Sequence, residues 1–224
     1  MQKVLSMNTY RASTSGTKAF AVCKRLFDIV LSLAMMVLLL PAFAVISLVA
    51  AIDTRSTPIF IQTRMGRNNV PFRMFKFRTM SKDAPGDVAS CRLAEPDRYI
   101  SRTGRLLRRL SLDELPQLLN IFVGQMSFVG PRPVVLSETD LLEMRTRNGA
   151  CSVRPGLTGV AQTSGRDHVT VYEKAKMDAF YSNNMSASLD MRVLLLTVGY
   201  VLRSQDVHEG PLTNSESLRK KRSA

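Results

Sequence analysis

An adjacent pair of carboxylates, Asp113 and Glu114, lies at the centre of the most chemically informative stretch of this chain. The stretch covers residues 105–133 and reads RLLRRLSLDELPQLLNIFVGQMSFVGPRP. Arginines precede the pair, and Arg132 follows it between two prolines that fix the backbone on both sides of one guanidinium. Two carboxylates among fixed cations can hold a divalent metal ion and an anionic phosphate together. The pattern therefore predicts a site for a phosphorylated substrate.

The acidic pair also has a purely structural interpretation. Ser111 and Glu114 have the spacing of a capping box, and acidic residues in a first helical turn complement the helix dipole. With Ser111 as N-cap, Pro116 would lie one turn inside the helix and remove a backbone hydrogen bond, whereas a cap at Asp113 would place Pro116 acceptably in the first turn. The local pattern leaves open whether the two acids are helix caps or parts of a site.

Further candidate phosphate contacts lie outside this stretch. Residues 58–80 predict β structure with a turn at residues 66–69. Strand alternation then places Lys76 and Arg78 on one face, although a solvated strand face would look the same. Arg154 lies in VRPGLTG, residues 153–159, which repeats the arginine, proline and glycine of the 130–133 turn. Together with Arg132, these residues are the candidate phosphate- and substrate-binding cations.

The composition indicates an anionic partner. The chain has 224 residues and a formal net charge of +13, which suits nucleic acid, anionic lipid or a phosphorylated substrate. Its three cysteines are odd in number and far apart, without metal-ligand spacing, which favours a reduced, cytosol-facing protein. His168 and His208 have no partner at ligand spacing.

An apolar run of 24 residues without a charge lies between Asp28 and Asp53. A helix of that length can cross a hydrocarbon core of roughly 30 Å. Pro41 lies in the middle of the run, where it kinks a helix. The positive-inside rule favours both basic flanks on the cytoplasmic side, so we expect a re-entrant helix rather than a span. The flanks carry Lys18, Lys24 and Arg25 before the run and Arg55, Arg64 and Arg67 after it.

These patterns predict an α+β fold that is mostly helical. An N-terminal re-entrant membrane helix would precede a small cytosolic catalytic domain with a short β element and amphipathic interfacial helices. The expected divisions are a disordered leader (1–17), the anchor (18–55), the catalytic domain (56–203) and a polar basic tail (204–224). Helices are expected over 103–110, 115–122, 139–147, 172–181 and 189–203, the last capped by Ser188, and a loop over 81–99.

Five motifs occur in order along the chain: KFRTM (76–80), SLDELPQLLN (111–120), SFVGPRP (127–133), VRPGLTG (153–159) and SGRD (164–167). With the basic helix and the proline-broken run before them, they resemble the bacterial sugar transferases, the monotopic phosphoglycosyl transferases that start exopolysaccharide and glycan assembly. The resemblance covers residues 24–203. It implies an enzyme of the bacterial inner membrane, in contact with membrane lipid, whose catalytic domain lies on the cytosolic face.

The resemblance also implies a reaction and residue roles. The family transfers a sugar-1-phosphate from a UDP-sugar to a polyprenyl phosphate, usually undecaprenyl phosphate, by a ping-pong mechanism that releases UMP. Asp113 would be the nucleophile that forms a phosphosugar-aspartyl intermediate, and Glu114 would hold Mg²⁺ against the diphosphate. Arg108 and Arg132 match the family's phosphate-contacting arginines. Lys76 and Arg154 match the lysine of its KFRTM motif and the arginine of its VRPG motif.

The chain departs from the family pattern at three places. Leu40 replaces the serine that often precedes the breaking proline, residues 160–162 lack the usual tryptophan, and Asp167 stands where asparagine is common. The last two changes fall in a region expected near the sugar, and galactose or glucose is expected only by analogy with short exopolysaccharide-type members. The alternative is a non-catalytic basic membrane adaptor for anionic lipid or acidic partners. Nucleic acid is not expected, because no recognised binding motif is visible.

Overall fold

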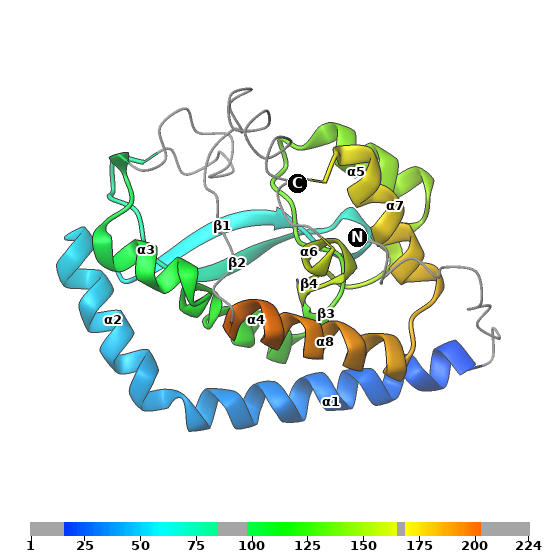
Figure 1. Ribbon diagram of the computed structural model, residues 1–224, viewed down its shortest axis with the longest axis horizontal. Coiled ribbons are helices and arrows are strands. Elements are labelled where there is room, and N and C mark those ends of the chain that lie inside the picture. Colours follow the sequence, from blue (N-terminus) through cyan, green and yellow to red (C-terminus); the bar gives the residue numbers. More distant parts are fainter. Residues whose placement is uncertain (1–15, 85–97, 165–168, 203–224) are drawn as a thin grey trace, which may run out of the picture.

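The computed structural model describes residues 16–84, 98–164 and 169–202 and confirms a mostly helical α+β fold (Figure 1). The predicted tail and most of the predicted leader and 81–99 loop lie outside the described residues. The helices are α1 (Gly16–Leu38), α2 (Leu40–Thr54), α3 (Arg102–Arg109), α4 (Gln117–Val123), α5 (Thr139–Arg147), α6 (Val160–Thr163), α7 (Val171–Asn183) and α8 (Ala187–Leu202). The strands are β1 (Ile59–Met65), β2 (Pro71–Phe77), β3 (Ser127–Val129) and β4 (Gly156–Thr158).

The apolar run forms two helices, α1 and α2, with a bend of 66° between them. Pro41 has no N–H to donate, and it lies in the first turn of α2, where a missing donor is tolerated best. The break therefore falls where the proline predicted it. Within the described ranges, no single helix is long and apolar enough to cross a membrane. The bent pair taken together meets the requirements of length and apolar composition. Membrane insertion remains a prediction.

Three polar side chains of α1 contact the rest of the protein. Lys24 donates to Asp190 of α8 at 2.6 Å, and Arg25 donates twice, at 2.7 Å, to carbonyls at the C-terminal end of α4. Asp28, 1% exposed, accepts a hydrogen bond from the backbone N–H of Phe128. Lys24 and Arg25, two of the cations that precede the apolar run, thus join α1 to the rest of the protein, which lies along this helix in Figure 1.

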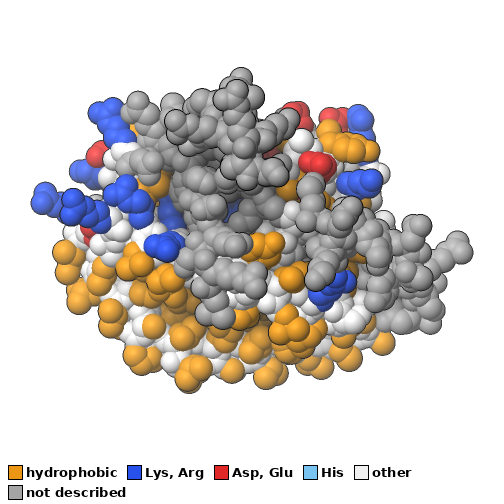
Figure 2. Space-filling view, in the orientation of Figure 1, with side chains coloured by type: hydrophobic (Ala, Val, Ile, Leu, Met, Phe, Trp, Pro, Cys, Tyr) orange, Lys and Arg blue, Asp and Glu red, His pale blue; other side chains and the backbone are white. Residues whose placement is uncertain are grey.

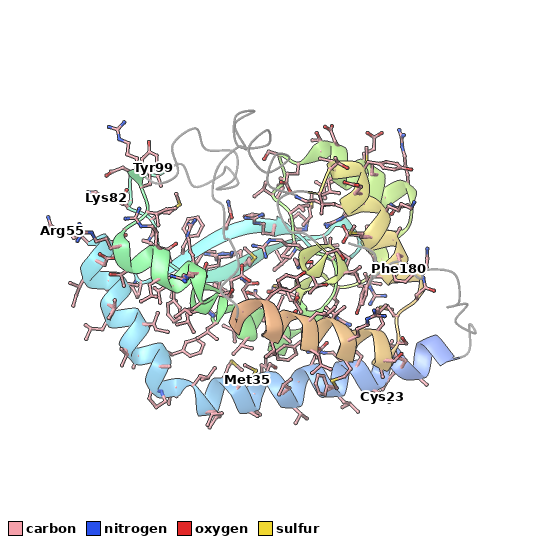
Figure 3. The ribbon with its side chains drawn as sticks, in the orientation of Figure 1. Cys23, Met35, Arg55, Lys82, Tyr99 and Phe180 are labelled. Atoms are coloured by element: carbon pink, nitrogen blue, oxygen red, sulfur yellow. The ribbon has the colours of Figure 1, made fainter. Side chains whose placement is uncertain are left out.

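The predicted hairpin is confirmed. Strands β1 and β2 pair antiparallel around the turn at residues 66–69, with Ile59 opposite Phe77. From β2, Phe72 and Met74 enter the main core. Met35 of α1 packs against that core from below in Figure 3. Other members of the core are Leu118 and Ile121 of α4, Met126, Phe128 and Val129 around β3, Val160 of α6, Tyr181 of α7 and Val193 of α8.

Strands β3 and β4 form a parallel pair that the sequence did not predict. Each has three residues, too few for an alternating pattern to be visible. The pairing lays the 130–133 turn against the VRPGLTG segment, and a Cβ at Gly156 would overlap the backbone of Gly130. Glycine is therefore required for this close approach.

The predicted N-cap of the last helix is wrong by two positions. Ser188 lies inside α8, which begins at Ala187, and the Ser186 hydroxyl accepts the hydrogen bond from the N–H of Leu189 at 3.3 Å. Helix α8 has both buried and exposed apolar positions. Val193 is 2% exposed, whereas Leu195 is 66% exposed.

Candidate active site

The acidic pair lies in a short 3-10 turn, η4 (Leu112–Glu114), between α3 and α4. Ser111 has a φ of 57°, a left-handed conformation that reverses the chain after α3, and its side chain makes no capping bond. Helix α4 begins only at Gln117, with Pro116 as its N-cap. The capping-box interpretation is therefore wrong, because the proline moves the start of the helix past the acids and directs them elsewhere.

Glu114 gathers two of the predicted cations. Lys76 Nζ and Arg132 Nη2 donate to the same oxygen, Oε1, at 2.8 and 3.0 Å. Lys76 comes from β2 and Arg132 from the turn after β3, so three separate elements meet here. Burial disfavours the charge on Glu114, but Lys76 and then Arg132 outweigh it, and the pKa of this carboxyl lies well below its usual range.

Asp113 has the opposite electrostatic character. It is 7% exposed, and burial raises the pKa of its carboxyl from 3.8 to about 6. The positive charge of Lys76 opposes this rise, and the negative charge of Glu114 adds to it. Two neighbouring carboxyls with separated pKa values are typical of sites in which each has a different task.

Arg108 approaches the pair from α3. Its Nε donates to the hydroxyl of Thr79 at 2.7 Å, just beyond the end of β2. Its positive charge also lowers the pKa of Asp113, after the larger effect of Lys76. The structure therefore brings Arg108, Lys76 and Arg132 around Asp113 and Glu114.

The other two predicted cations make different contacts. Arg78 donates to the backbone oxygen of Thr57 at 3.0 Å, and its guanidinium lies 5.5 Å from the ring centre of Phe60. Arg154 Nε donates to the carbonyl of Gly124 at the end of α4, at 2.8 Å. Burial and then Arg25 lower the pKa of Arg154. None of the contacts found among the described residues joins Arg78 or Arg154 to the acidic pair, and their roles remain predictions.

A small hollow lies beside Glu114. Two of its polar lining residues were not predicted from the sequence, Arg64 of β1 and Gln117 of α4. Arg64 donates to the side chain of Gln62 at 2.6 Å. The sequence did contain one signal for Gln117. It is a polar residue four positions after the candidate acid Asp113, a spacing at which two side chains are neighbours on a helix. The full lining is Arg64, Met74, Lys76, Glu114, Gln117, Arg132 and Pro133.

The donor set suits a metal ion that arrives with its substrate. Over the described ranges, no group of three or more His, Cys, Asp or Glu side chains could by itself hold a metal. Mg²⁺ is commonly bound through one or two carboxylates together with substrate phosphates. Asp113 and Glu114 provide such carboxylates beside cations that can bind the same phosphates.

Comparison with known proteins gives a consistent result. The model of the family described as "Bacterial sugar transferase" matches residues 19–204. "Uncharacterized sugar transferase EpsL" of Bacillus subtilis is 38% identical over 195 residues, which cover 84% of this chain and 91% of the relative. "Exopolysaccharide production protein ExoY" of Sinorhizobium fredii is 33% identical over 198 residues, covering 82% of this chain and 87% of the relative.

A longer relative is named for its reaction. "UDP-glucose:undecaprenyl-phosphate glucose-1-phosphate transferase" of Klebsiella pneumoniae is 34% identical over 192 residues, which cover 82% of this chain but 41% of the relative. The family model spans α1 to α8, including the hairpin and the acidic pair. The expected resemblance is thus confirmed, and the chain belongs to the bacterial sugar transferase family.

Proposed function

We propose that this chain transfers a sugar-1-phosphate from a UDP-sugar to undecaprenyl phosphate, with release of UMP. The observation that carries the proposal is the convergence of Lys76 and Arg132 on Glu114, beside the buried Asp113. Such a set of charges suits a diphosphate. The name of the Klebsiella relative supports the choice of substrates, and that of ExoY supports a role in exopolysaccharide synthesis.

The proposed reaction has two displacements at one phosphorus atom. A carboxylate oxygen of Asp113 attacks the β-phosphorus, and the bond between that phosphorus and the bridging oxygen breaks, so that UMP leaves with the oxygen. A phosphate oxygen of undecaprenyl phosphate then attacks the same phosphorus and displaces Asp113. Lys76, Arg108 and Arg132 would stabilise the negative charge that develops on the phosphoryl oxygens.

Glu114 is the proposed protein ligand of Mg²⁺. Both cations donate to Oε1 of this carboxylate, which would hold the metal ion beside them. When bound, Mg²⁺ would neutralise part of the diphosphate charge and favour attack by an anionic nucleophile. The alternative function, a non-catalytic membrane adaptor, does not explain why the carboxylate of Glu114 lies between two cations in a hollow.

The membrane is the proposed setting of the reaction. Large exposed apolar side chains line the outer surface of α1 and α2 and continue onto α4 and α8, and Figure 2 shows them along the lower edge of the molecule. Contiguous apolar surface of this kind marks an interaction site. With this face in the inner membrane, the acidic pair can meet a lipid-borne phosphate on the cytosolic side. These side chains include Val30, Leu33, Val37, Leu38, Leu40, Val45, Leu48, Ile52, Leu119, Val123, Leu195 and Val198.

The first test measures UMP released by the purified, detergent-solubilised protein with Mg²⁺, undecaprenyl phosphate and a panel of UDP-sugars, with UDP-glucose and UDP-galactose first. We expect release with one donor and its complete loss in Asp113→Asn. Asp140→Asn is the matched control, because Asp140 is an exposed carboxylate on α5. Substantial turnover by Asp113→Asn would exclude Asp113 as the nucleophile.

The ping-pong order needs a separate measurement. Without undecaprenyl phosphate, the wild-type protein should release at most one UMP per active site, and the peptide that contains Asp113 should gain the mass of the phosphosugar. A single-displacement enzyme would release no UMP until the lipid phosphate was added.

A further inference from the structure

Gln117 is a buried amide without a hydrogen-bond partner. The residue is 2% exposed, and its Nε2 finds no acceptor in the part of the chain that the structure describes. A buried donor that gives up water without gaining a partner is unfavourable for folding, and such groups are rare in native proteins. Its presence therefore requires a physical explanation.

A second amide in the same helix shows that the surroundings of α4 can satisfy such a group. Asn120 is 0% exposed, and its Nδ2 donates to the carbonyl of Arg73 at 2.8 Å and to Gln125 Oε1 at 2.7 Å. Its Oδ1 accepts from the N–H of Phe75 at 3.1 Å. Asn120 thus serves the fold by holding α4 to β2, whereas Gln117, one turn earlier, has no such bond for its donor.

The position of Gln117 points to a ligand. It lines the same hollow as Lys76, Glu114 and Arg132. The two cations are held there by Glu114 Oε1, and the Arg132 side chain is 52% exposed, so it has room to turn. An entering phosphate competes with Glu114 for both cations. Phosphate oxygens accept hydrogen bonds only, which matches a donor with no partner in the fold.

We infer that Gln117 is a substrate-binding residue, whose Nε2 donates a hydrogen bond to a phosphate oxygen of the diphosphate donor once Lys76 and Arg132 turn from Glu114 to that phosphate. The inference rests on the proposed function, because it assigns the substrate contact within that site. Gln117 adds a directed donor without adding charge, so it orients the diphosphate that the cations attract.

The test uses Gln117→Met, which keeps the length of the side chain and removes its polar atoms. Two quantities are measured on the purified protein: the Tm in detergent, and the Kd of UDP with Mg²⁺ by titration calorimetry. We expect the Tm to stay or rise, because an unsatisfied donor is removed, and the Kd to increase roughly 10- to 100-fold, as for a lost hydrogen bond to a charged group. Gln117→Glu, which replaces the donor by an acceptor, should weaken UDP at least as much and serves if Gln117→Met does not fold.

The matched control is Asn120→Leu in the same helix. It removes an amide that is fully bonded within the fold, so the Tm should fall. A wild-type Kd in Gln117→Met would overturn the inference, whatever the Tm. A lower Tm together with a wild-type Kd would show further that the amide serves the fold, as Asn120 does.

The binding measurement separates this inference from the proposed reaction. A wild-type protein that binds UDP but releases no UMP from any UDP-sugar would overturn the transfer reaction, while the effect of Gln117→Met on the Kd would still decide the role of Gln117. Release of UMP by the wild type, with an unchanged Kd in Gln117→Met, would overturn the inference about Gln117 alone. A wild type that neither binds UDP nor releases UMP would overturn both.

Discussion

Asp113 and Glu114 are neighbours in the chain, yet their environments separate their acidities. Glu114 meets two cations directly, so its charged form is stabilised and its pKa falls. Asp113 is held away from water, so burial raises its pKa to about 6. Glu114 is therefore suited to hold cations at all working pH values. Asp113 is a better base and nucleophile than an ordinary aspartate, because a higher pKa accompanies greater nucleophilicity.

The raised pKa of Asp113 predicts how the rate depends on pH. Attack on phosphorus requires the ionised carboxylate, and below about pH 6 the protonated form prevails. We expect kcat/KM for UMP release to fall about tenfold per pH unit on the acid side of this pKa and to level off above it. The measurement is kcat/KM between pH 5 and 8, because this ratio reports the free enzyme.

Asp140→Asn is the control for the pH series. It should reproduce the wild-type profile, because the exposed carboxylate of Asp140 lies on α5, outside the acidic pair. A profile that is flat down to pH 5 would show that the titration of Asp113 does not limit the reaction in this range.

At the scale of elements, the turn that carries Arg132 is held by its neighbours on both sides. The carbonyl of Pro131 accepts from the N–H of Gly156, and that of Arg132 accepts from Arg145 Nη1 at 3.0 Å. Arg145 of α5 is itself paired with Asp178 of α7 at 2.7 Å. Both partners are buried, at 7% and 2% exposure. Helices α5 and α7 thus support the turn that carries Arg132, for which phosphate binding is proposed.

Removing one partner of this pair should weaken the whole domain. Asp178→Ala leaves the charge of Arg145 buried and uncompensated, which costs about 3–5 kcal/mol in the free energy of unfolding. Urea unfolding in detergent measures the change. Arg147→Ala is the control on the same helix, because it breaks an exposed pair with Glu143 and should change the stability by less than about 0.5 kcal/mol. Equal effects in the two variants would mean that Arg145 and Asp178 do not support the domain.

At the scale of the whole molecule, large exposed apolar side chains gather along one face. Helices α1 and α2 form the lower boundary in Figure 1, and the large exposed apolar side chains of Figure 2 follow them. Arg55, directly after α2, extends away from the molecule in Figure 3, on the same end as Lys82. The formal charge of +13 suits a protein held against anionic lipid.

If the α1–α2 pair is re-entrant, as the sequence predicts, both of its ends lie in the cytosol. Single cysteines in place of Lys18 and Arg55, in a protein whose three native cysteines are replaced by serine, should both resist an impermeant thiol reagent in intact cells. Both should react after the inner membrane is opened. Labelling of the Lys18 position alone in intact cells would instead show that the pair crosses the bilayer, despite its 66° bend.

Sequence patterns alone determined the features that depend on neighbouring residues. The hairpin follows from its turn residues, α5 follows the predicted bounds, and the break at Pro41 follows from the missing donor. The acidic pair, Lys76 and Arg132 could be named because they lie in short motifs, and Arg108 because it precedes the pair where the resembled family has a phosphate-contacting arginine. In each case the information lies within a few positions of the feature.

Tertiary structure alone decided which charges meet. Lys76 and Glu114 are 38 positions apart, and Lys24 and Asp190 are 166 apart, so no local pattern could pair them. The parallel β3–β4 pair and the unsatisfied amide of Gln117 likewise exist only through packing between distant segments. Strand alternation predicted Lys76 and Arg78 on one face, but the two side chains have different partners. The backbone N–H of Arg78 still donates to the carbonyl of Pro58 at 2.7 Å, and its side chain donates to the carbonyl of Thr57 rather than reaching Glu114. The period of a strand fixes the face of a side chain but not its partner, which depends on the surrounding fold.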